Sequence, residues 1–496
     1  MKKMIRGKII SMALCLIVSI FALPMTMFAQ TGISAEEHIL NELRRAGIPN
    51  AAVAVIQGEE TSFILKDSEL DTLFELASVT KPITAFGVLL LEDMGLLSVN
   101  DPVNLHLPWF EVRYNGVLVP HEDITIYDLI HHTSGIAQNE NRFPRAELTE
   151  TTDEFIARLI GMELDFYPST SGAYSNMAYA ILGLLIEAVS GQSYDDFMTQ
   201  QVLHPLGLYN TFTNPQQARD TGRNVSGHVF GFLQARPGTR GVYRNIIDVP
   251  PGGIYSCVSD MARWAGIQLG LVDVPEQFAR IVQRSHTLRN DSDIFVDDGG
   301  FFRGYFFAGG WVQNVETGHL EHAGGGTAGW TTKIRIFPES NTAVVVLANL
   351  RLGISTDNLA RMSLDAVVNG TFISLGQDWQ RWVDRWFTLI TVLGVVYFCQ
   401  FVWKAIKLRK QLQGGAMIKS NFSSKSLKGL SGVIFSIACL VFYYIFPYVL
   451  LDTTRASLLN NWVTSFGVAA IAIWINVLHD VFSWWIKEFV KLPDAT

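Results

Sequence analysis

The sequence predicts an α+β fold in which one antiparallel sheet is divided along the chain by a large helical block. Two groups of strand-like runs, one around residue 55 and one after residue 304, lie on either side of a mostly helical stretch from about 120 to 285. Segregated strands and helices of this kind are typical of α+β proteins, whereas regular alternation would predict a parallel sheet. We therefore expect the two strand groups to meet in one sheet flanked by helices.

Local signals place the elements of this fold in order. Ala35–Ala46 has the apolar spacing of an amphipathic helix and ends at Gly47. Two strand-like runs follow on either side of Gly58: Ala51–Gln57 and Thr61–Leu65. A helix is expected from about Ser78 to Met94. Four predicted strands and a helix follow the helical block: Tyr305–Gln313, Leu320–Ala323, Thr332–Phe337, Ala343–Ala348 and about Thr356–Val368.

The charge distribution divides the 496-residue chain into three parts. Only 17% of its residues are charged, against roughly 25% in an ordinary soluble protein. Residues 1–29 carry four basic and no acidic side chains, residues 385–496 carry 11 basic and 4 acidic ones, and residues 30–384 have a net charge of −19. Such an acidic central part gives no electrostatic basis for binding nucleic acid, so we expect no nucleic-acid partner.

Four apolar stretches are predicted membrane segments. Residues 1–29 have the basic-then-apolar order of a secretory signal peptide, which is either cleaved after Ala29 or kept as an N-terminal anchor. Within 385–490, three stretches are long enough, or nearly so, to cross about 30 Å of hydrocarbon as helices: 386–403, 430–451 and 462–485. Trp and Tyr cluster at their ends, as at membrane interfaces. The alternative, buried core helices, would need a surrounding soluble domain.

The connection between the first two of these segments predicts their orientation. Residues 404–428 contain six Lys and Arg409 but no acidic residue, and such basic loops stay in the cytoplasm. The segment 386–403 then runs from outside to inside, which places residues 30–380 outside the cell. The expected protein is therefore a multi-pass protein of the plasma membrane, in contact with lipid, whose folded domain is extracytoplasmic.

The first candidate for chemistry is the pair Ser78 and Lys81. Three residues apart at the start of a helix, the two side chains share one face. An amine in this position can take the hydroxyl proton, and the helix N-terminus adds partial positive charge where an oxyanion would develop. The alternative for this short motif is a helix cap with a surface lysine.

Two further motifs follow along the chain. Tyr174 and Asn176 lie before an apolar helix, and offer a phenol for proton relay and an amide to orient a substrate carbonyl. Ordinary capping of that helix is the alternative. His322 precedes Gly324 and Gly325 at the end of a predicted strand, where glycines let a substrate backbone approach the strand edge and the imidazole could donate to a carboxylate or to developing negative charge. The alternative there is a Gly-rich hairpin turn.

Together the three motifs, separated by about 96 and 148 residues, resemble those of the serine β-lactamase and penicillin-binding-protein superfamily. The family pattern is S-x-x-K, then Y-x-N, then K/H-x-G, and the similarity is to the class C-like branch, which includes D-amino-acid peptidases and esterases. It covers roughly residues 35–370. It includes the residues before the nucleophile, 74–77 (FELA), and a loop-shaping stretch at 129–135 (LIHHTSG).

This resemblance implies a β-lactamase/transpeptidase-like fold and a role for each motif residue. Ser78 would be the acylated nucleophile, Lys81 its general base and Tyr174 the group that relays a proton to the leaving group. Asn176 would hold the substrate amide and His322 would occupy the third-motif position, next to Gly324. The backbone N–H groups of Ser78 and Gly325 would form the oxyanion hole.

The expected activity is that of a serine hydrolase without metal or cofactor. The His at position 322, where efficient penicillin hydrolases of this branch carry Lys, favours a peptidase or esterase acting on D-amino-acid-containing substrates. One alternative is a peptidase that activates the prodrug form of a non-ribosomal peptide. Another, of a different class, is a penicillin-binding sensor that is acylated without turnover. The sequence leaves the substrate and the oligomeric state open.

Overall fold

A computed structural model of the chain describes ten ranges, and the structural statements below concern these alone: 33–136, 151–237, 246–287, 305–314, 316–325, 329–351, 355–376, 379–414, 417–418 and 490–491. The predicted signal or anchor at 1–29 and the predicted membrane segments 430–451 and 462–485 lie outside these ranges. The described ranges include the whole of the expected sheet and most of the expected helical block.

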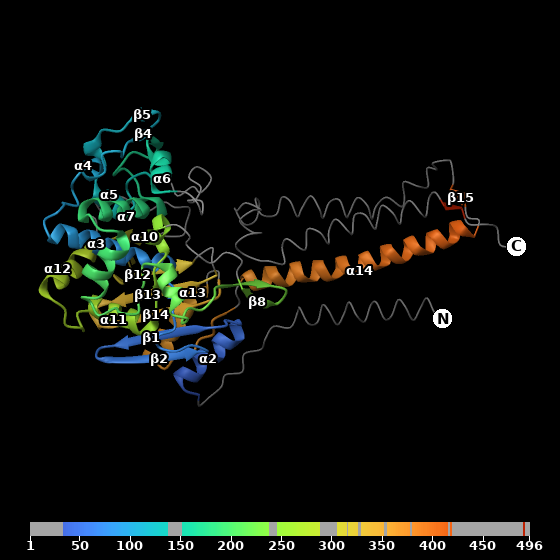
Figure 1. Ribbon diagram of the computed structural model, residues 1–496. Coiled ribbons are helices and arrows are strands. Elements are labelled where there is room, and N and C mark those ends of the chain that lie inside the picture. Colours follow the sequence, from blue (N-terminus) through green and yellow to red (C-terminus); the bar gives the residue numbers. More distant parts are fainter. Residues whose placement is uncertain are drawn as a thin grey trace.

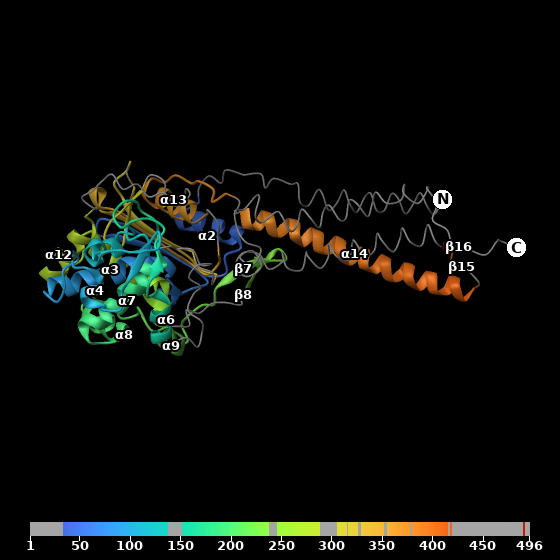
Figure 2. The same cartoon turned by 90° about the horizontal axis from the view of Figure 1, so that it is seen from above.

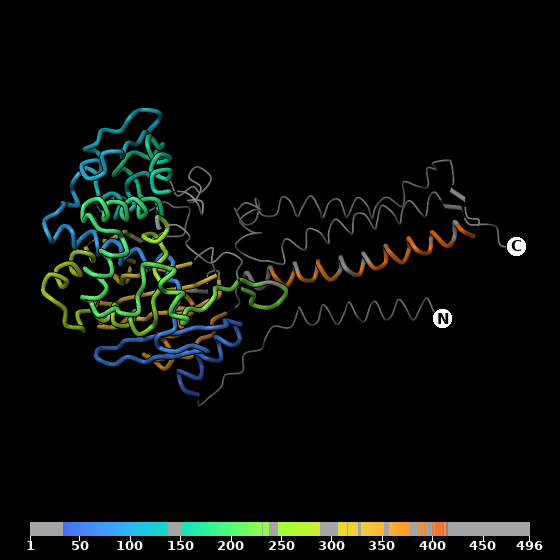
Figure 3. Tube along the Cα trace, in the orientation of Figure 1, coloured from blue at the N-terminus to red at the C-terminus, as the bar shows by residue number. Residues whose placement is uncertain are grey.

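A seven-stranded antiparallel sheet forms the centre of the domain, in the order β10-β11-β12-β13-β14-β1-β2 (Figure 1). The strands from the two ends of the domain pair directly, since β1 runs antiparallel to β14 with Ala51 opposite Ala348. Figure 3 shows this meeting of early and late chain segments. The bounds of the seven strands are β1 Ala51–Gln57, β2 Glu60–Lys66, β10 Tyr305–Phe307, β11 Val312–Asn314, β12 Leu320–Gly325, β13 Thr331–Phe337 and β14 Thr342–Ala348.

The sheet separates two apolar cores because successive side chains of a strand point to opposite faces. On one face, Val53 and Val344 pack with residues of helices α2 (Ala35–Ala46) and α13 (Ser355–Val368). On the other face, Ala52 and Val345 belong to the larger core with the helical block. The helices of that block that bear on the site are α3 Thr80–Asp93, α5 Ile126–Ile130, α7 Asn176–Ser190, α10 Val249–Gly252, α11 Val258–Gln268 and α12 Glu276–Ser285. The predicted α+β architecture, an antiparallel sheet flanked by helices with a large helical insertion, is confirmed.

The structure departs from the predicted elements at several points. The predicted strand Tyr305–Gln313 is two strands, because Gly309 and Gly310 make a turn in which Gly310 has φ +83°. Short strands also form before and within the mostly helical region, and of these β3 (Phe74–Glu75) and β9 (Tyr255–Ser256) pair with each other. Other short elements between the two strand groups of the main sheet are α4 Val103–His106, β4 Val112–Tyr114, β5 Val117–Leu118, α6 Thr152–Leu159, β6 Met162–Glu163, α8 Tyr194–Phe197, α9 Pro215–Asp220, β7 His228–Gly231 and β8 Gln234–Pro237.

Helix α14, Trp379–Gln413, extends away from the domain (Figures 1 and 2). Its 35 residues correspond to about 52 Å at 1.5 Å per residue. At the domain end, Asp384 accepts hydrogen bonds from the backbone N–H groups of Phe232 and Leu233 in the β7–β8 turn, at 3.0 and 2.7 Å. Further along, α14 exposes apolar side chains that include Val392, Val396, Val402, Trp403 and Ile406.

Among the residues that the structure describes, none of the helices combines the length and the apolar character needed to cross a membrane.

Candidate active site

Ser78 lies just before helix α3 and directly after a residue with a strained backbone. The chain reaches it from strand β3 through Leu76, whose N–H donates to the carbonyl of Ile254 at 2.8 Å. The next residue, Ala77, has φ +47°, in the left-handed region that residues other than glycine adopt at some cost in energy. The chain then turns directly into a short 3₁₀ turn, Ala77–Val79, and α3. Ser78 is thereby half-buried at a helix N-terminus, where the helix dipole favours negative charge.

The amine of Lys81 is fully buried and is held by three oxygen atoms. Its Nζ lies 2.7 Å from Asn176 Oδ1, 2.7 Å from the carbonyl oxygen of Pro251 and 3.3 Å from Ser78 Oγ. The first two oxygens can only accept, so each takes one N–H of the amine. The third position faces Ser78 and holds a proton in the ammonium form or a lone pair in the neutral amine. This geometry suits a general base that takes the proton of Ser78.

Tyr174 and Asn176 approach Lys81 from the start of α7. The ring centroid of Tyr174 is 4.6 Å from Lys81 Nζ, within the range of a cation–π contact. Ser175 is the N-cap of α7, because its hydroxyl accepts the N–H of Ala178 at 3.1 Å. Because Ser175 caps the helix, the side chain of Asn176 is not needed as a cap, and its Oδ1 accepts a hydrogen bond from Lys81. Tyr174, Asn176, Lys81 and Ser78 are therefore brought together as expected.

His322 is buried on strand β12 and is neutral. Burial and then the charge of Lys81 lower its pKa to about 3, so the imidazole carries no charge at neutral pH. Its Nδ1 is 3.0 Å from the carbonyl oxygen of Ala323, which can only accept, so the proton lies on Nδ1 and the lone pair on Nε2. The ring centroid is 6.2 Å from that of Tyr174. His322 therefore presents Nε2 as an acceptor and not, as its place in the motif predicts, as a donor to negative charge.

Gly324 brings strand β12 against the segment that carries the nucleophile. A Cβ atom on Gly324 would lie 2.3 Å from the carbonyl oxygen of Leu76 and 2.1 Å from Thr332 Oγ1. Gly325, the next residue, is exposed, and a Cβ there would meet nothing within 4 Å. The glycines thus place the open end of β12 beside Ala77 and Ser78. That the N–H groups of Ser78 and Gly325 form an oxyanion hole stays a prediction.

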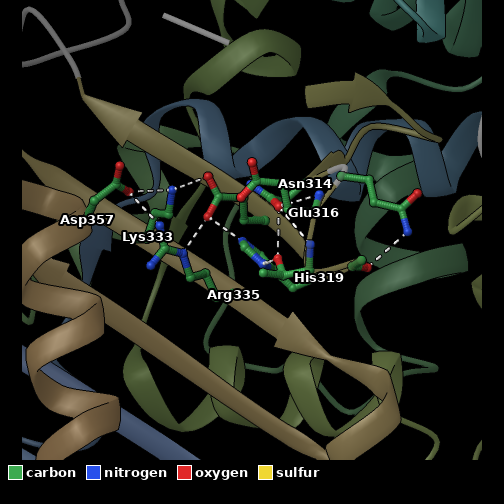
Figure 4. Close-up of polar contacts among 10 residues, drawn as sticks. Asn314, Glu316, His319, Lys333, Arg335 and Asp357 are labelled. Carbon is green, nitrogen blue, oxygen red and sulfur yellow. Dashed lines mark hydrogen bonds and ion pairs between the residues drawn. The ribbon is translucent and has the colours of Figure 1, made fainter. Parts of the chain in front are cut away.

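A network of charged side chains holds β12 from the opposite face of the sheet (Figure 4). The carboxylate of Glu321 bonds Lys333 at 2.6 Å, His319 at 3.1 Å and also Arg335, while Asp357 of α13 bonds Lys333 at 2.7 Å. Burial by itself would raise the pKa of Glu321, but the His319 hydrogen bond and the charges of Lys333 and Arg335 lower it below 4.5. Glu321 therefore stays ionised and fixes the strand directly next to His322.

Two further groups contact the motif residues, and the sequence analysis does not single them out. One is the carbonyl of Pro251, which lies at the end of α10 and bonds Lys81. The other is His132, which packs its ring on Tyr174 with a centroid distance of 4.7 Å. A backbone carbonyl leaves no mark in a sequence pattern, whereas His132 stands in the 129–135 stretch that the family resemblance includes. Within the described ranges, no three His, Cys, Asp or Glu side chains form a metal-binding group.

Comparison with known proteins shows which family the domain resembles. The Beta-lactamase family model matches residues 35–368. Protein flp of Staphylococcus aureus (strain COL) is 26% identical over 442 residues, which cover 86% of this chain and 84% of that protein. A D-alanine carboxypeptidase AmpC from Burkholderia cenocepacia superposes with a TM-score of 0.54 at 19% identity, covering 67% of this chain and 99% of that one.

A class C beta lactamase from Rhodobacter sphaeroides superposes equally well, with a TM-score of 0.54 at 24% identity over 68% of this chain and 99% of that one. At such identities the superpositions show a shared fold, and the predicted β-lactamase/transpeptidase-like fold is confirmed. The family match extends over two thirds of the chain and includes every motif residue. The chain is therefore a member of the beta-lactamase family and a serine hydrolase.

Proposed function

We propose that this protein is a membrane-anchored, extracytoplasmic serine hydrolase that cleaves D-amino-acid-containing peptides or esters through an acyl-enzyme on Ser78. The observation that carries the proposal is the position of Lys81. Two of its N–H groups are taken by carbonyl oxygens, and the remaining direction faces the hydroxyl of Ser78 at 3.3 Å. The amine is therefore placed to take the proton of the Ser78 hydroxyl.

The reaction follows from this arrangement. Ser78 Oγ attacks the substrate carbonyl carbon while its proton passes to Lys81. The carbonyl oxygen becomes an oxyanion near the helix N-terminus and the open end of β12. As the C–N or C–O bond breaks, the proton returns to the leaving group by way of Tyr174, whose ring lies against the Lys81 amine. Water then attacks the acyl-enzyme, and release of the acid restores Ser78.

The uncharged state of His322 supports a substrate that is neutral near the third motif. With its proton on Nδ1, the imidazole presents a lone pair at Nε2 and suits an N–H or O–H donor better than a carboxylate. An amidated end or an acyl-D-amino-acid bond inside a longer peptide supplies such an N–H donor, whereas an ester shares with them only the absence of charge. The name of one structural neighbour, a D-alanine carboxypeptidase, supports the D-amino-acid class.

Membrane anchoring is supported by sequence features. The apolar stretches and the basic connection at 404–428 are those of a multi-pass protein with its basic loop in the cytoplasm. The similarity to protein flp covers 86% of the chain and so continues beyond the residues that the family model matches. A cysteine placed at Gly415, in a chain whose native cysteines are replaced by serine, should resist a membrane-impermeant reagent in intact cells. Labelling there would contradict the orientation.

Acylation and turnover of the full-length protein test the activity. We expect a labelled penicillin or fluorophosphonate to modify the wild type, and Ser78→Ala to abolish the labelling. Labelling that persists in Ser78→Ala would refute the assignment of the nucleophile. An acyl-enzyme that forms and is never released would favour the penicillin-binding sensor over the hydrolase.

The substrate class is tested with matched pairs of peptides. Each pair has the same D-Ala, D-Asn or acyl-D-amino-acid bond and differs only in a free or an amidated C-terminus, and products are read by mass spectrometry. We expect faster cleavage of the neutral member. Faster cleavage of the carboxylate member would contradict the assigned role of His322, and cleavage only at acyl-D-Asn would favour the prodrug-activating peptidase.

A further inference from the structure

His132 stands in an unusual backbone position immediately after α5. It has φ +58°, in the left-handed region, where histidine occurs more often than most residues. Asp128 fixes this turn, because its carbonyl accepts the N–H of Thr133 at 2.9 Å and its carboxylate accepts the hydroxyl of Thr133 at 2.8 Å. The side chain of His132 is 3% exposed, so the turn aims the imidazole into the domain.

The two polar groups of His132 bind the two neighbours of Tyr174. Its backbone carbonyl accepts the N–H of Ala173 at 2.9 Å, and its Nδ1 accepts the N–H of Ser175 at 3.0 Å. His132 thus forms hydrogen bonds with the residues on both sides of Tyr174. Because Ser175 is also the N-cap of α7, the same contact positions the start of the helix that carries Asn176.

The imidazole ring also packs against the Tyr174 ring. The two ring centroids are 4.7 Å apart, and on its other sides the imidazole contacts Tyr179 at 5.1 Å and Phe307 at 4.5 Å. Lys81 lies 4.6 Å from the centroid of the Tyr174 ring. The tyrosine is therefore contacted both by the catalytic amine and by His132, and a smaller side chain at 132 would open space next to it.

This contact requires an uncharged imidazole. Nδ1 can accept the N–H of Ser175 only when the ring proton is on Nε2. Burial lowers the pKa of His132 well below 6.5, and the nearby charge of Lys81 lowers it further. The buried ammonium of Lys81 thus helps to keep the acceptor available.

We propose that His132 is a positioning residue for acyl transfer, which holds Tyr174 in register with Lys81 and Ser78 by accepting the N–H groups of Ala173 and Ser175 and by packing on the tyrosine ring. This role rests on the proposed Ser78 acyl-enzyme. It predicts that His132 acts through Tyr174 and that an acceptor at the Nδ1 position, together with tolerance of a left-handed backbone, is what the position needs.

Asparagine and leucine at position 132 separate these requirements. Asn tolerates φ +58° and can place Oδ1 where Nδ1 lies, whereas Leu is similar in bulk but lacks the acceptor. We expect His132→Leu to lower the maximal rate of acylation by labelled penicillin about 10- to 100-fold with little change in half-saturating concentration, as misplacement of reacting groups does. His132→Asn keeps the acceptor but loses the ring that packs on Tyr174, so it should restore most of the lost rate without reaching that of the wild type. His131→Asn is the matched control, because the neighbouring imidazole bonds the carbonyl of Tyr127.

A double-mutant cycle with Tyr174→Phe distinguishes positioning from general structural support. If His132 acts through the Tyr174 hydroxyl, His132→Leu should cause little further loss in the Tyr174→Phe background, because residues that act as a unit are not additive. Full additivity, or failure of His132→Asn to restore the rate in a protein with wild-type melting temperature, would overturn the proposal. If His132→Leu does not fold, the acylation rates of His132→Asn and His132→Gln are compared instead. The amide oxygen of Gln lies one bond beyond the Nδ1 position, so the proposal predicts that His132→Gln is acylated more slowly than His132→Asn. A wild type that is never acylated at Ser78 would instead refute the proposed function.

Discussion

Gly324 allows the closest approach between strand β12 and the segment that carries Ser78, and alanine at this position tests how the site is assembled. An added Cβ would lie 2.1 Å from Thr332 Oγ1, 2.3 Å from the carbonyl oxygen of Leu76 and 3.0 Å from Ala77 Cβ. The first two atoms are joined by a buried hydrogen bond, so neither is the free end of a flexible side chain. Strand β12 and the Leu76–Ser78 segment must therefore separate.

The size of the effect follows from these distances. Ordinary contacts of a methyl carbon lie at about 3.5–4.0 Å, so the strand must move by more than 1 Å or the Thr332 bond must break. Overpacking of this kind costs about 1–3 kcal/mol of stability. The same movement shifts Gly325, and if its N–H is the oxyanion donor that the family resemblance implies, loss of that donor costs about 10²–10³ in rate. We expect the acylation rate of Gly324→Ala to fall within that range.

The assay compares stability and acylation in two neighbouring variants. Acylation by labelled penicillin is followed by gel fluorescence, and melting is followed by circular dichroism. Gly325→Ala is the matched control for stability, because its Cβ meets nothing within 4 Å, and it should melt at the wild-type temperature. A Gly324→Ala protein that melts and is acylated like the wild type would refute the close approach of β12 to the nucleophile segment.

Three other substitutions test separate parts of the structure. Lys81→Met should reduce acylation by at least about 10²-fold while the domain still unfolds cooperatively in a thermal melt; wild-type acylation would exclude Lys81 as the base. Glu321→Gln should lower stability at pH 7 by about 3–5 kcal/mol, measured by urea unfolding. Because the folded pKa of Glu321 lies below 4.5, the wild type holds this contribution above about pH 4.5 and loses it as the pH falls further, so the two proteins should converge in acid. Asp384→Ala should free the N–H groups of Phe232 and Leu233, both at positive φ, and raise the rate of proteolysis in the β7–β8 turn; unchanged cleavage would contradict the anchoring of this turn by α14.

The sheet could be predicted from the sequence because its strands carry strong local signals. The predicted bounds of Ala35–Ala46 and Ala51–Gln57 agree with the structure, since helical spacing ends at a left-handed Gly47 and the strand is uniformly apolar. Tyr305–Gln313 is predicted as one strand but forms two. The pair Gly309 and Gly310 is a local turn signal within this run. The fold adds the close packing of Gly309 against Ser285 from a distant helix, which no local pattern predicts.

At the site, too, the sequence predicts some residues and not the atoms that hold them in place. Residue types and spacing single out Ser78, Lys81, Tyr174 and Asn176 as candidates, and the resemblance to a known family supplies their roles as nucleophile, base, relay and substrate-binding group. The groups that hold the base and the relay in place could not be found in this way. The Pro251 carbonyl belongs to the backbone, and the imidazole of His132 acts through Nδ1 and a left-handed turn that only the folded chain defines.

Among the motif residues of the site, Lys81 carries the charge that sets the protonation state of its neighbours. The buried Lys81 amine directs its donors at Asn176, Pro251 and Ser78, and its charge contributes to the low pKa of both His132 and His322. A positively charged His322 would bind a substrate carboxylate, but it would also lie near the ammonium form of Lys81 and oppose proton uptake by the base. A neutral His322 removes that repulsion. A neutral histidine in the third motif therefore favours proton transfer to Lys81 and, under the proposed function, substrates without a carboxylate at this position.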